Sequence, residues 1–593
     1  MDGAASRPPA PDLLPLLPNL GSAAASLLAV VSLLTAALLW PSGAGAVTRE
    51  ELARHSAEVE RSWAGVTDER GAVADALEPG RGRFNYGTLM LAEAQLRGAA
   101  RTGDAQVAEA AVRQTLGTIE RGGPQDTYYL LAAGTMLQSG LAGRFPEAAW
   151  QRIAAPLSQW IGSFPPYVDN GFSDPTHYSN RKLVWAVGAL ALAQSGVPAT
   201  APGAVAADPA AVRAEVTRIV SSLAVAYAAR HAFSDGLAPL RASSDRVHFP
   251  NAYHVYSVYL LELLYAADPA LFSPQALQLR EEAGNYALSL MAPDGQVTHA
   301  GRSLEQSWVL AAAAAYGARR ASQGGPQAGA FRSFADRAAV RLLQVHGRLS
   351  DGTIPIVPGL RAEYNPSITD SYAAMTQYNG LTLMMLEDAV AQWPDEVASS
   401  ALPADGRYLV ADLAGSGLVW GRSQGVWWVF SGRGSQGDPR YEQGLVSVKV
   451  LGATGWSDVL AARGVSGGPR SRWLLKTRRG RARLRLTRVY GSGRKVRMTG
   501  NWRLLDGNRR YREAAVELTV SRGGVSVVTR LRRNETLNAA VWKTDARVAP
   551  VTITGRTRMA TCRVTASGPA CPFSLRWRGR GLVGLRLPAP VAP

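Results

Sequence analysis

The sequence RKLVWAVGALALAQ, residues 181–194, decides how the first half of the chain is interpreted. It is rich in Ala and Leu, which favour helices, and a polar segment leads directly into it. Similar stretches, bounded by Gly, Pro or Asp, recur from Arg49 to about Trp393 with apolar residues at helical spacing. They predict helices over Asn85–Arg101, Ala105–Ile119, Thr127–Ser139, Arg181–Gln194, Ala210–Arg230, Asn251–Ala267, Gln275–Met291, Ser303–Ala321 and Asp370–Trp393. Since no strand pattern interrupts them, the sequence predicts an all-α domain over residues 47–395.

The pattern changes after Pro394. Short segments rich in Val, Trp, Thr and Arg follow, such as Val426–Gly432 and Val496–Leu504, and Gly-rich turns separate them. Many of them alternate apolar with polar residues, which is typical of an antiparallel β-sandwich. We therefore expect a β-sandwich domain over residues 396–593 that ends in a disordered tail, Pro588–Pro593.

The N-terminus predicts export. Ala23–Trp40 is an uncharged apolar run, and residues 44–46 (Ala-Gly-Ala) have the small-x-small pattern of a cleavage site. Residues 1–46 are thus expected to be a signal peptide of a secreted protein. The run is also long enough for an uncleaved N-terminal anchor, which would leave the protein on a membrane, facing outside. In either case Cys562 and Cys571, the only two cysteines, are expected to form a disulfide.

The chain is strongly basic, with a formal net charge of +18. This favours an anionic partner, whether nucleic acid, a membrane surface or an acidic polysaccharide. Much of the charge lies in Lys476–Arg488, whose alternation of charged and apolar residues predicts the solvated face of a strand. The sequence contains no nucleic-acid-binding motif, no phosphate-binding Gly motif and no His/Cys cluster with metal-ligand spacing. We therefore expect neither nucleic acid, metal nor organic cofactor.

Three polar segments stand out in the helical region. The first, residues 167–181, places Asn180 and Arg181 at the start of the quoted helix. Asn180 either caps that helix or neutralises a substrate carboxylate, and Arg181 is a candidate for binding an anionic sugar. Trp185, four residues further on, is either a stacking platform for a sugar or part of the core.

The second segment, residues 233–257, places His248, Tyr253, His254 and Tyr256 within nine positions. A neutral His can accept a proton near pH 7, and Tyr can donate one. As a group these side chains favour a catalytic role, although each alone fits a structural one.

The third segment, residues 294–308, carries Arg302 after a glycine at the predicted start of a helix. Arg302 is suited to hold an anionic sugar by paired hydrogen bonds, or it belongs to a turn. Glu305 is either a first-turn capping residue or a substrate ligand. Trp308 is a second candidate for stacking, with burial in the core as its alternative.

The motifs occur in the order Tyr178-Ser-Asn-Arg181, then Asp235-Gly followed by a His and several Tyr, then Gly301-Arg302-Ser303. In this order they resemble the signature positions of the hyaluronate, chondroitin AC and xanthan lyase family of polysaccharide lyases. The resemblance covers about Asn170–Trp308, and Leu237 stands where the family has Ser. It implies an incomplete (α/α) toroid followed by an antiparallel β-sandwich. It also implies as catalytic residues Asn180, His248 or His254, Tyr253 or Tyr256, and Arg302.

The resemblance therefore implies a polysaccharide lyase that cleaves a uronic-acid-containing polysaccharide by β-elimination. Together with the N-terminal run, we expect it to be secreted, and we also expect a monomer. One alternative is a glycoside hydrolase on the same toroid, which would need two carboxylates from among Asp174, Asp235, Asp245 and Glu305. The other is a non-catalytic protein that binds anionic glycans.

Overall fold

The computed structural model describes most of the chain between residues 46 and 588, within one compact unit, Gly43–Pro593. The described ranges are 46–75, 84–124, 126–165, 179–230, 251–299, 303–358, 375–413, 415–432, 443–452, 455–460, 472–521, 524–541, 552–554, 557–560, 573–578 and 581–588. The predicted signal peptide or anchor, the pair Cys562 and Cys571, and all of the predicted tail beyond Pro588 lie outside these ranges. In the described part, no helix combines the length and the hydropathy needed to cross a bilayer.

The first part of the described chain is helical. Its α-helices are α2 (Arg49–Gly65), α3 (Tyr86–Thr102), α4 (Ala105–Glu120), α5 (Thr127–Leu141), α6 (Glu147–Ile161), α7 (Ser179–Gln194), α8 (Pro209–Arg230), α9 (Asn251–Ala267), α10 (Pro274–Leu290), α11 (Ser307–Ser322), α12 (Ala328–Arg341) and α13 (Met375–Gln392). Side chains cap several of their N-termini, because short polar groups satisfy the first free backbone N–H groups. Asn85 caps α3, Asp104 caps α4 and Asp126 caps α5 in this way.

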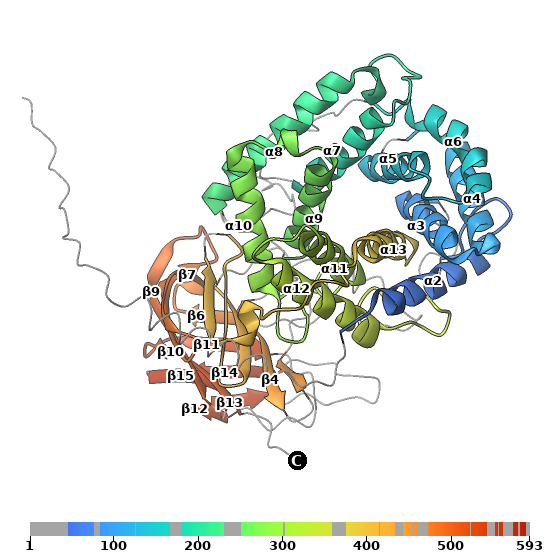
Figure 1. The fold of residues 1–593 in the computed structure, drawn as a ribbon. Coiled ribbons are helices and arrows are strands. Elements are labelled where there is room, and N and C mark those ends of the chain that lie inside the picture. The colour runs from blue at the N-terminus through green and yellow to red at the C-terminus, as the bar shows by residue number, and fades with distance from the viewer. Residues whose placement is uncertain are drawn as a thin grey trace, which may run out of the picture. The chain divides into compact units, whose positions relative to one another are not determined.

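The helices form two concentric layers. The odd-numbered helices pack one against the next, α3 on α5, α5 on α7, α7 on α9, α9 on α11 and α11 on α13, and α13 packs back on α3. The even-numbered helices lie outside this ring (Figure 1). The predicted toroid fold is thus confirmed, and the core lies between and inside the inner helices.

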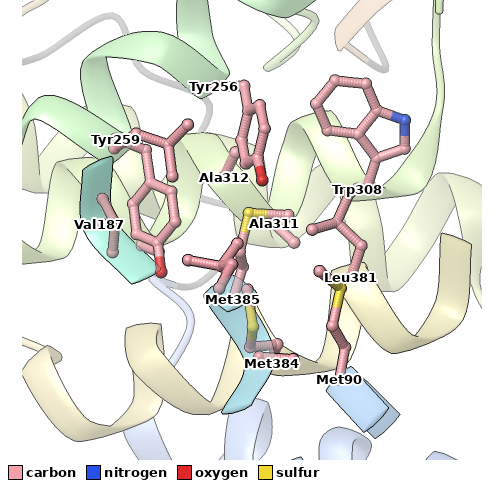
Figure 2. Packing of buried hydrophobic residues seen from close by; sticks show 14 of the residues in the cluster. Met90, Val187, Tyr256, Tyr259, Trp308, Ala311, Ala312, Leu381, Met384 and Met385 are labelled. Atoms are coloured by element: carbon pink, nitrogen blue, oxygen red, sulfur yellow. The ribbon is translucent and has the colours of Figure 1, made fainter. Parts of the chain in front are cut away.

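Small residues let the inner helices approach closely. Gly188, at the centre of the quoted stretch, faces Leu130 of α5, and a Cβ at Gly188 would lie 2.6 Å from the Leu130 carbonyl oxygen. Gly134 of α5 has the reciprocal relation to α7, since its Cβ would lie 2.6 Å from the Gly188 carbonyl oxygen. A side chain at either position would push the two backbones apart. Larger side chains, among them Met384, Met385 and Trp308, fill the interior of the ring (Figure 2).

The second part consists of antiparallel strands in two sheets. One sheet has the order β1 (Tyr408–Asp412), β2 (Leu418–Ser423), β3 (Val426–Ser431), β4 (Gly444–Gly452) and β5 (Gly455–Leu460). The other has the order β12 (Thr552–Thr554), β15 (Gly581–Pro588), β10 (Gly524–Leu531), β9 (Arg510–Ser521), β8 (Lys495–Leu504), β7 (Gly480–Ser492), β6 (Arg472–Thr477), β11 (Thr536–Val541), β14 (Phe573–Arg578) and β13 (Thr557–Ala560). The predicted β-sandwich is confirmed.

Strand β3 shows how the parts join. Its six residues are all buried, although successive side chains of a strand point to opposite faces. Trp428 and Phe430 pack into the core between the two sheets. Trp427 and Val429 face the other way and pack with Leu290, at the end of α10, in a separate cluster. The five-stranded sheet is therefore covered on both faces, by the ten-stranded sheet and by the helical part.

Candidate functional site

The N-terminal ends of the inner helices share one end of the ring. Each outer helix returns the chain, so successive inner helices run in the same direction. Asn180, Tyr253 and Trp308 lie in the first turns of α7, α9 and α11. The fold thus brings residues of all three predicted segments to the same end.

Five aromatic side chains at this end, Tyr86, Tyr128, Tyr253, Tyr256 and Trp308, form what we call the aromatic cluster. Tyr86 of α3 stacks on Tyr128 of α5, with ring centroids 4.6 Å apart. Trp308 lies edge-on to Tyr253 and Tyr256, at centroid distances of 5.6 and 5.4 Å. The two groups are close enough to interact. The pKa of Tyr128 is raised first by burial and then by the nearby Tyr253 phenol. Four inner helices therefore contribute to one cluster.

The two tyrosines predicted as alternatives differ in accessibility. Tyr256 is only 1% exposed and lies among the buried side chains of the ring (Figure 2). Tyr253 is partly buried and packs against the edge of the same core. Tyr253 is therefore the more exposed of the two and the better candidate for contact with substrate.

Asn180 and Arg181 place polar groups beside the cluster. Asn180 is buried, and its side chain hydrogen-bonds to the Tyr128 phenol, lowering the pKa of that phenol as an amide donor does. Its Oδ1 has no hydrogen-bond partner among the described residues. Arg181 lies at 3.6 Å from the carboxylate of Asp126 and is about half exposed. A buried acceptor without a partner costs about 1–3 kcal/mol, and a ligand hydroxyl would satisfy it.

The buried phenols of the cluster are held in their protonated form. Burial raises the pKa of Tyr86, Tyr128 and Tyr256, and neighbouring phenols raise it further in each case. These three groups therefore donate hydrogen bonds at neutral pH, and they are unsuited to act as bases.

His254 faces away from the cluster. Its Nε2 lies 3.0 Å from the backbone oxygen of Ala283 in α10, and its ring contacts Tyr286 of the same outer helix. Burial lowers the pKa of His254 to about 4, so the imidazole is neutral. Its contacts are those of a packed interface between α9 and α10, and we do not retain it among the proposed catalytic residues.

The two predicted stacking platforms are covered by protein. Trp185 is 3% exposed and Trp308 is 2% exposed. The Trp308 indole N–H donates to Gln306 Oε1 at 2.6 Å, which fixes the ring against Tyr253 and Tyr256. Neither tryptophan presents a free face to a sugar, so both are left out of the proposal below.

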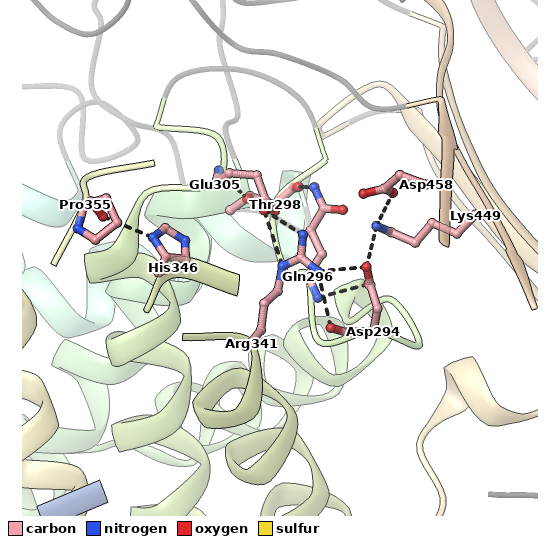
Figure 3. Close-up of polar contacts among 9 residues, drawn as sticks. All are labelled: Asp294, Gln296, Thr298, Glu305, Arg341, His346, Pro355, Lys449 and Asp458. Atoms are coloured by element: carbon pink, nitrogen blue, oxygen red, sulfur yellow. Dashed lines mark hydrogen bonds and ion pairs between the residues drawn. The ribbon is translucent and has the colours of Figure 1, made fainter. Parts of the chain in front are cut away.

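Glu305 belongs to a second polar group, which we call the ion-pair chain: Glu305, Arg341, Asp294, Lys449 and Asp458 (Figure 3). Arg341 binds Glu305 at 2.7 Å and Asp294 at 2.8 Å. Lys449 of β4 binds the same Asp294 at 2.6 Å and Asp458 of β5 at 2.5 Å. The ion-pair chain therefore links the helical part to the five-stranded sheet.

The charges of the ion-pair chain shift the pKa values of its members. Burial alone would raise the pKa of Asp294, but Arg341 and Lys449 outweigh it and hold that pKa well below its usual range. Burial alone would lower the pKa of Lys449, but Asp294 and Asp458 outweigh it and raise that pKa. Glu305 differs, since burial raises its pKa more than Arg341 lowers it.

The loop before α11 corrects one predicted helix boundary. The sequence predicts a helix from Ser303, but α11 begins at Ser307. Ser303 and Glu305 have φ values of 60° and 56°, in the left-handed region that residues other than Gly rarely adopt. Arg341 holds the Glu305 side chain, and Thr298 accepts a hydrogen bond from the Glu305 backbone N–H at 3.0 Å. These long-range contacts keep the loop out of the helix.

Two predicted catalytic residues, His248 and Arg302, lie outside the described residues. Conversely, Tyr86, Asp126 and Tyr128 lie at the site and were not predicted. Each is in or next to the first turn of a predicted helix: Tyr86 follows Asn85, Asp126 caps α5, and Tyr128 follows Thr127. That position, shared with Asn180 and Tyr253, is the signal that would have found them. Within the described ranges, no group of three or more His, Cys, Asp or Glu residues is arranged to hold a metal ion.

Several solved structures are similar to this chain. A heparan sulfate lyase HepC mutant from Pedobacter heparinus is similar over 86% of this chain and 77% of its own, at 11% identity and a TM-score of 0.44. The chondroitin AC lyase of Streptomyces coelicolor A3 is similar over 93% of this chain and 80% of its own, at 12% identity and a TM-score of 0.43. A glycosyl hydrolase of family 88 from Bacteroides vulgatus is similar over 58% of this chain and 100% of its own, at 11% identity and a TM-score of 0.39.

These likenesses are distant, and they include both lyases and hydrolases. Likeness at this level carries no information on the reaction. No protein-family model matches the chain, and no curated protein matches it. The functional proposal therefore rests on the residues of the site.

Proposed function

We propose that the chain is a glycan-degrading enzyme, and specifically a polysaccharide lyase that cleaves a uronic-acid-containing polymer by β-elimination. The observation that carries the proposal is the meeting of an amide, a guanidinium and an accessible phenol at one end of the inner ring. Asn180, Arg181 and Tyr253 supply these groups from α7 and α9. The unsatisfied Oδ1 of Asn180 supports a ligand at this position.

The reaction removes the proton on C5 of the uronic acid. The electron pair forms a C4–C5 double bond, the C4–O bond breaks, and the leaving oxygen takes a proton. The difficulty is the negative charge that develops beside a carboxylate that is already negative. Asn180 can donate to that carboxylate while its bond to Tyr128 keeps the amide oriented, and Arg181 can pair with it.

Tyr253 is proposed as the proton donor to the leaving oxygen, since it is a partly exposed phenol of the cluster and is among the tyrosines that the family resemblance implies. His248 is proposed as the base and Arg302 as a further carboxylate ligand, both from the sequence. A neutral imidazole suits the base role near pH 7. The mechanism uses no cofactor.

A hydrolase remains the alternative because one carboxylate, Asp126, lies beside Arg181 at the site. Glycoside hydrolysis needs a second carboxylate across from the first. The two reactions differ in product: elimination leaves an unsaturated end group, and hydrolysis leaves a saturated one.

We also propose, from the sequence, that the protein is a secreted monomer and that an acidic polysaccharide is its substrate. The alternatives are an anchored form facing outside and a non-catalytic anionic-glycan-binding protein. Fractionation of the native host would separate the first two, and a native mass measurement would test the monomer.

The test is a screen of hyaluronan, chondroitin, xanthan, alginate and heparan substrates for the ultraviolet absorbance of the new double bond. The Tyr253→Phe variant goes through the same screen, so that absorbance from a contaminating lyase is recognised. Absorbance that depends on Tyr253 supports the proposal. Saturated products point to a hydrolase, and bound substrate without any product points to a binding protein.

A further inference from the structure

The tips of two adjacent β-hairpins carry a dense group of basic side chains. The β6–β7 hairpin supplies exposed Lys476, Arg478, Arg479 and Arg481. The β8–β9 hairpin lies beside it, because β7 pairs with β8 and the Leu505 backbone N–H bonds to the Arg481 carbonyl at 2.8 Å. We call the basic side chains at the ends of these two hairpins the basic tips.

The second hairpin adds Arg503, Arg509 and Arg510. Asp506, at its turn, and Glu513, which pairs with Arg510 at 3.0 Å, are the carboxylates that the described tips contain. Residues 476–481 and 503–513 contain eight cationic side chains and two carboxylates, and one of the eight, Arg512, pairs with Glu535 outside the tips at 2.6 Å, which leaves seven. The excess is local and does not depend on the charge of the whole chain.

The strand register places like charges opposite each other at this end of the sheet. Lys476 is directly opposite Arg481, and Arg503 is opposite Arg510. Like charges at such positions are destabilising. Further along the same strands the sheet uses opposite charges, since Arg497 is paired with Glu517. The same sheet thus pairs opposite charges elsewhere, whereas at the tips it places cations opposite cations.

The backbone of the β6–β7 turn does not depend on its basic side chains. Arg478 and Arg479 occupy the turn, and the Arg479 backbone N–H donates to Thr477 Oγ1 at 3.0 Å, so the turn is closed by Thr477 and not by the guanidiniums. Arg503 donates to the backbone oxygen of Asn508 at 3.0 Å, which leaves its charge uncompensated while fixing its position.

We propose that the basic tips bind the acidic polysaccharide at a second site, on strands of the ten-stranded sheet that contribute no residue to the aromatic cluster. The identity of the polymer rests on the proposed function, and the shared chemistry is a chain of carboxylate or sulfate groups. A polyanion bound here would release counterions, so its affinity would fall steeply with salt. Residues 476–481 and 503–513 contain one aromatic side chain, Tyr511, whereas nucleic-acid single strands are held largely by stacking of successive bases on several aromatic side chains. This favours a glycan over a nucleic acid.

The test compares two charge-reversal variants of equal net charge. Arg478→Glu/Arg479→Glu changes the basic tips, and Arg54→Glu/Arg144→Glu changes two exposed arginines of the helical part. Binding is measured on immobilised chondroitin sulfate and on hyaluronan, which separates sulfate from carboxylate recognition, and on duplex DNA. Each measurement is repeated over a range of salt concentrations, and thermal unfolding checks that both variants fold.

We expect the tip variant to bind at least one glycan about tenfold more weakly than the control variant, with a salt slope lower by roughly 1–2. Its kcat on a short oligosaccharide should equal that of the control variant, while its KM for polymer rises. Equal glycan affinity in the two variants overturns the inference, as does tighter binding to DNA than to either glycan. Binding is measured independently of product formation, so the two proposals can fail separately. If the protein forms no product but binds glycan through the basic tips, the proposed function is wrong and the second site is supported.

Discussion

The aromatic cluster and the ion-pair chain are both polar groups at the edge of buried core, yet they are satisfied in different ways. In the ion-pair chain each charged side chain has an opposite charge within 2.8 Å. At the aromatic cluster, Asn180 Oδ1 is buried without a hydrogen-bond partner among the described residues. A set of side chains whose charges are all paired within the protein is suited to stabilise the fold. A set that keeps an unsatisfied hydrogen-bonding atom is suited to bind a ligand.

The largest expected effect is on stability, from breaking the ion-pair chain. Arg341→Met leaves Glu305 buried without its cation and removes one of the two cations at Asp294. Removing one partner of a buried pair costs about 3–5 kcal/mol. The free energy of unfolding, measured by denaturant titration, should fall by about that amount. A fall below about 1 kcal/mol would contradict a structural role for the ion-pair chain.

The next effect is on activity, from Asn180→Ala at the aromatic cluster. Loss of one preorganised donor to a developing charge lowers kcat by about 10²–10³-fold. Stability should change much less than in Arg341→Met, because the Asn180 side chain already lacks one of its partners. Initial rates of double-bond formation and a denaturant titration on the same preparation measure both. If Asn180→Ala lowers the free energy of unfolding and leaves kcat unchanged, Asn180 has a structural role and not a catalytic one.

The third effect is a pH dependence of the joint between the helical part and the sheet. His299 is buried, bonds to the Leu290 backbone oxygen and packs on Trp427, and burial lowers its pKa to about 3. The unfolded chain binds a proton at this residue below about pH 6.5, and the folded chain does not, so stability is lost as pH falls from about 6.5 towards 3.

Each such imidazole contributes at most about 1.4 kcal/mol per pH unit in that window. His299→Gln should therefore flatten the fall in unfolding free energy between pH 6.5 and 4, relative to the unsubstituted chain. His254, whose pKa is lowered to about 4, provides a second buried imidazole for comparison. An unchanged slope in His299→Gln would show that His299 is protonated in the folded protein.

Sequence reasoning predicted local features well and long-range ones poorly. Helix α9 has the predicted bounds, Asn251–Ala267, because its start and its apolar pattern are both local. The start of α11 was wrong by four residues, since Arg341 and Thr298 hold Glu305 in a left-handed conformation that no local pattern encodes.

The same limit applies to the site. Asn180 and Tyr253 stood out because polar residues crowd the sequence before their helices. Tyr86 and Tyr128 occupy the same position at the start of their helices, but only the packing of α3 and α5 in the inner ring brings them to the others. Lys449 pairs with Asp294 across 155 positions, so the joint between the two parts was not predictable at all.

The central claim is that Tyr253 faces a ligand at the N-terminal end of the inner ring. The most direct measurement compares the rate of double-bond formation in Tyr253→Phe with that in Tyr129→Phe. Tyr129, next to Tyr128 on α5, packs edge-on against Trp160 of the outer helix α6 and serves as the matched control. We predict a loss of about 100-fold or more in Tyr253→Phe and a change within about twofold in Tyr129→Phe, at equal stability. Equal rates in the two variants would contradict the account.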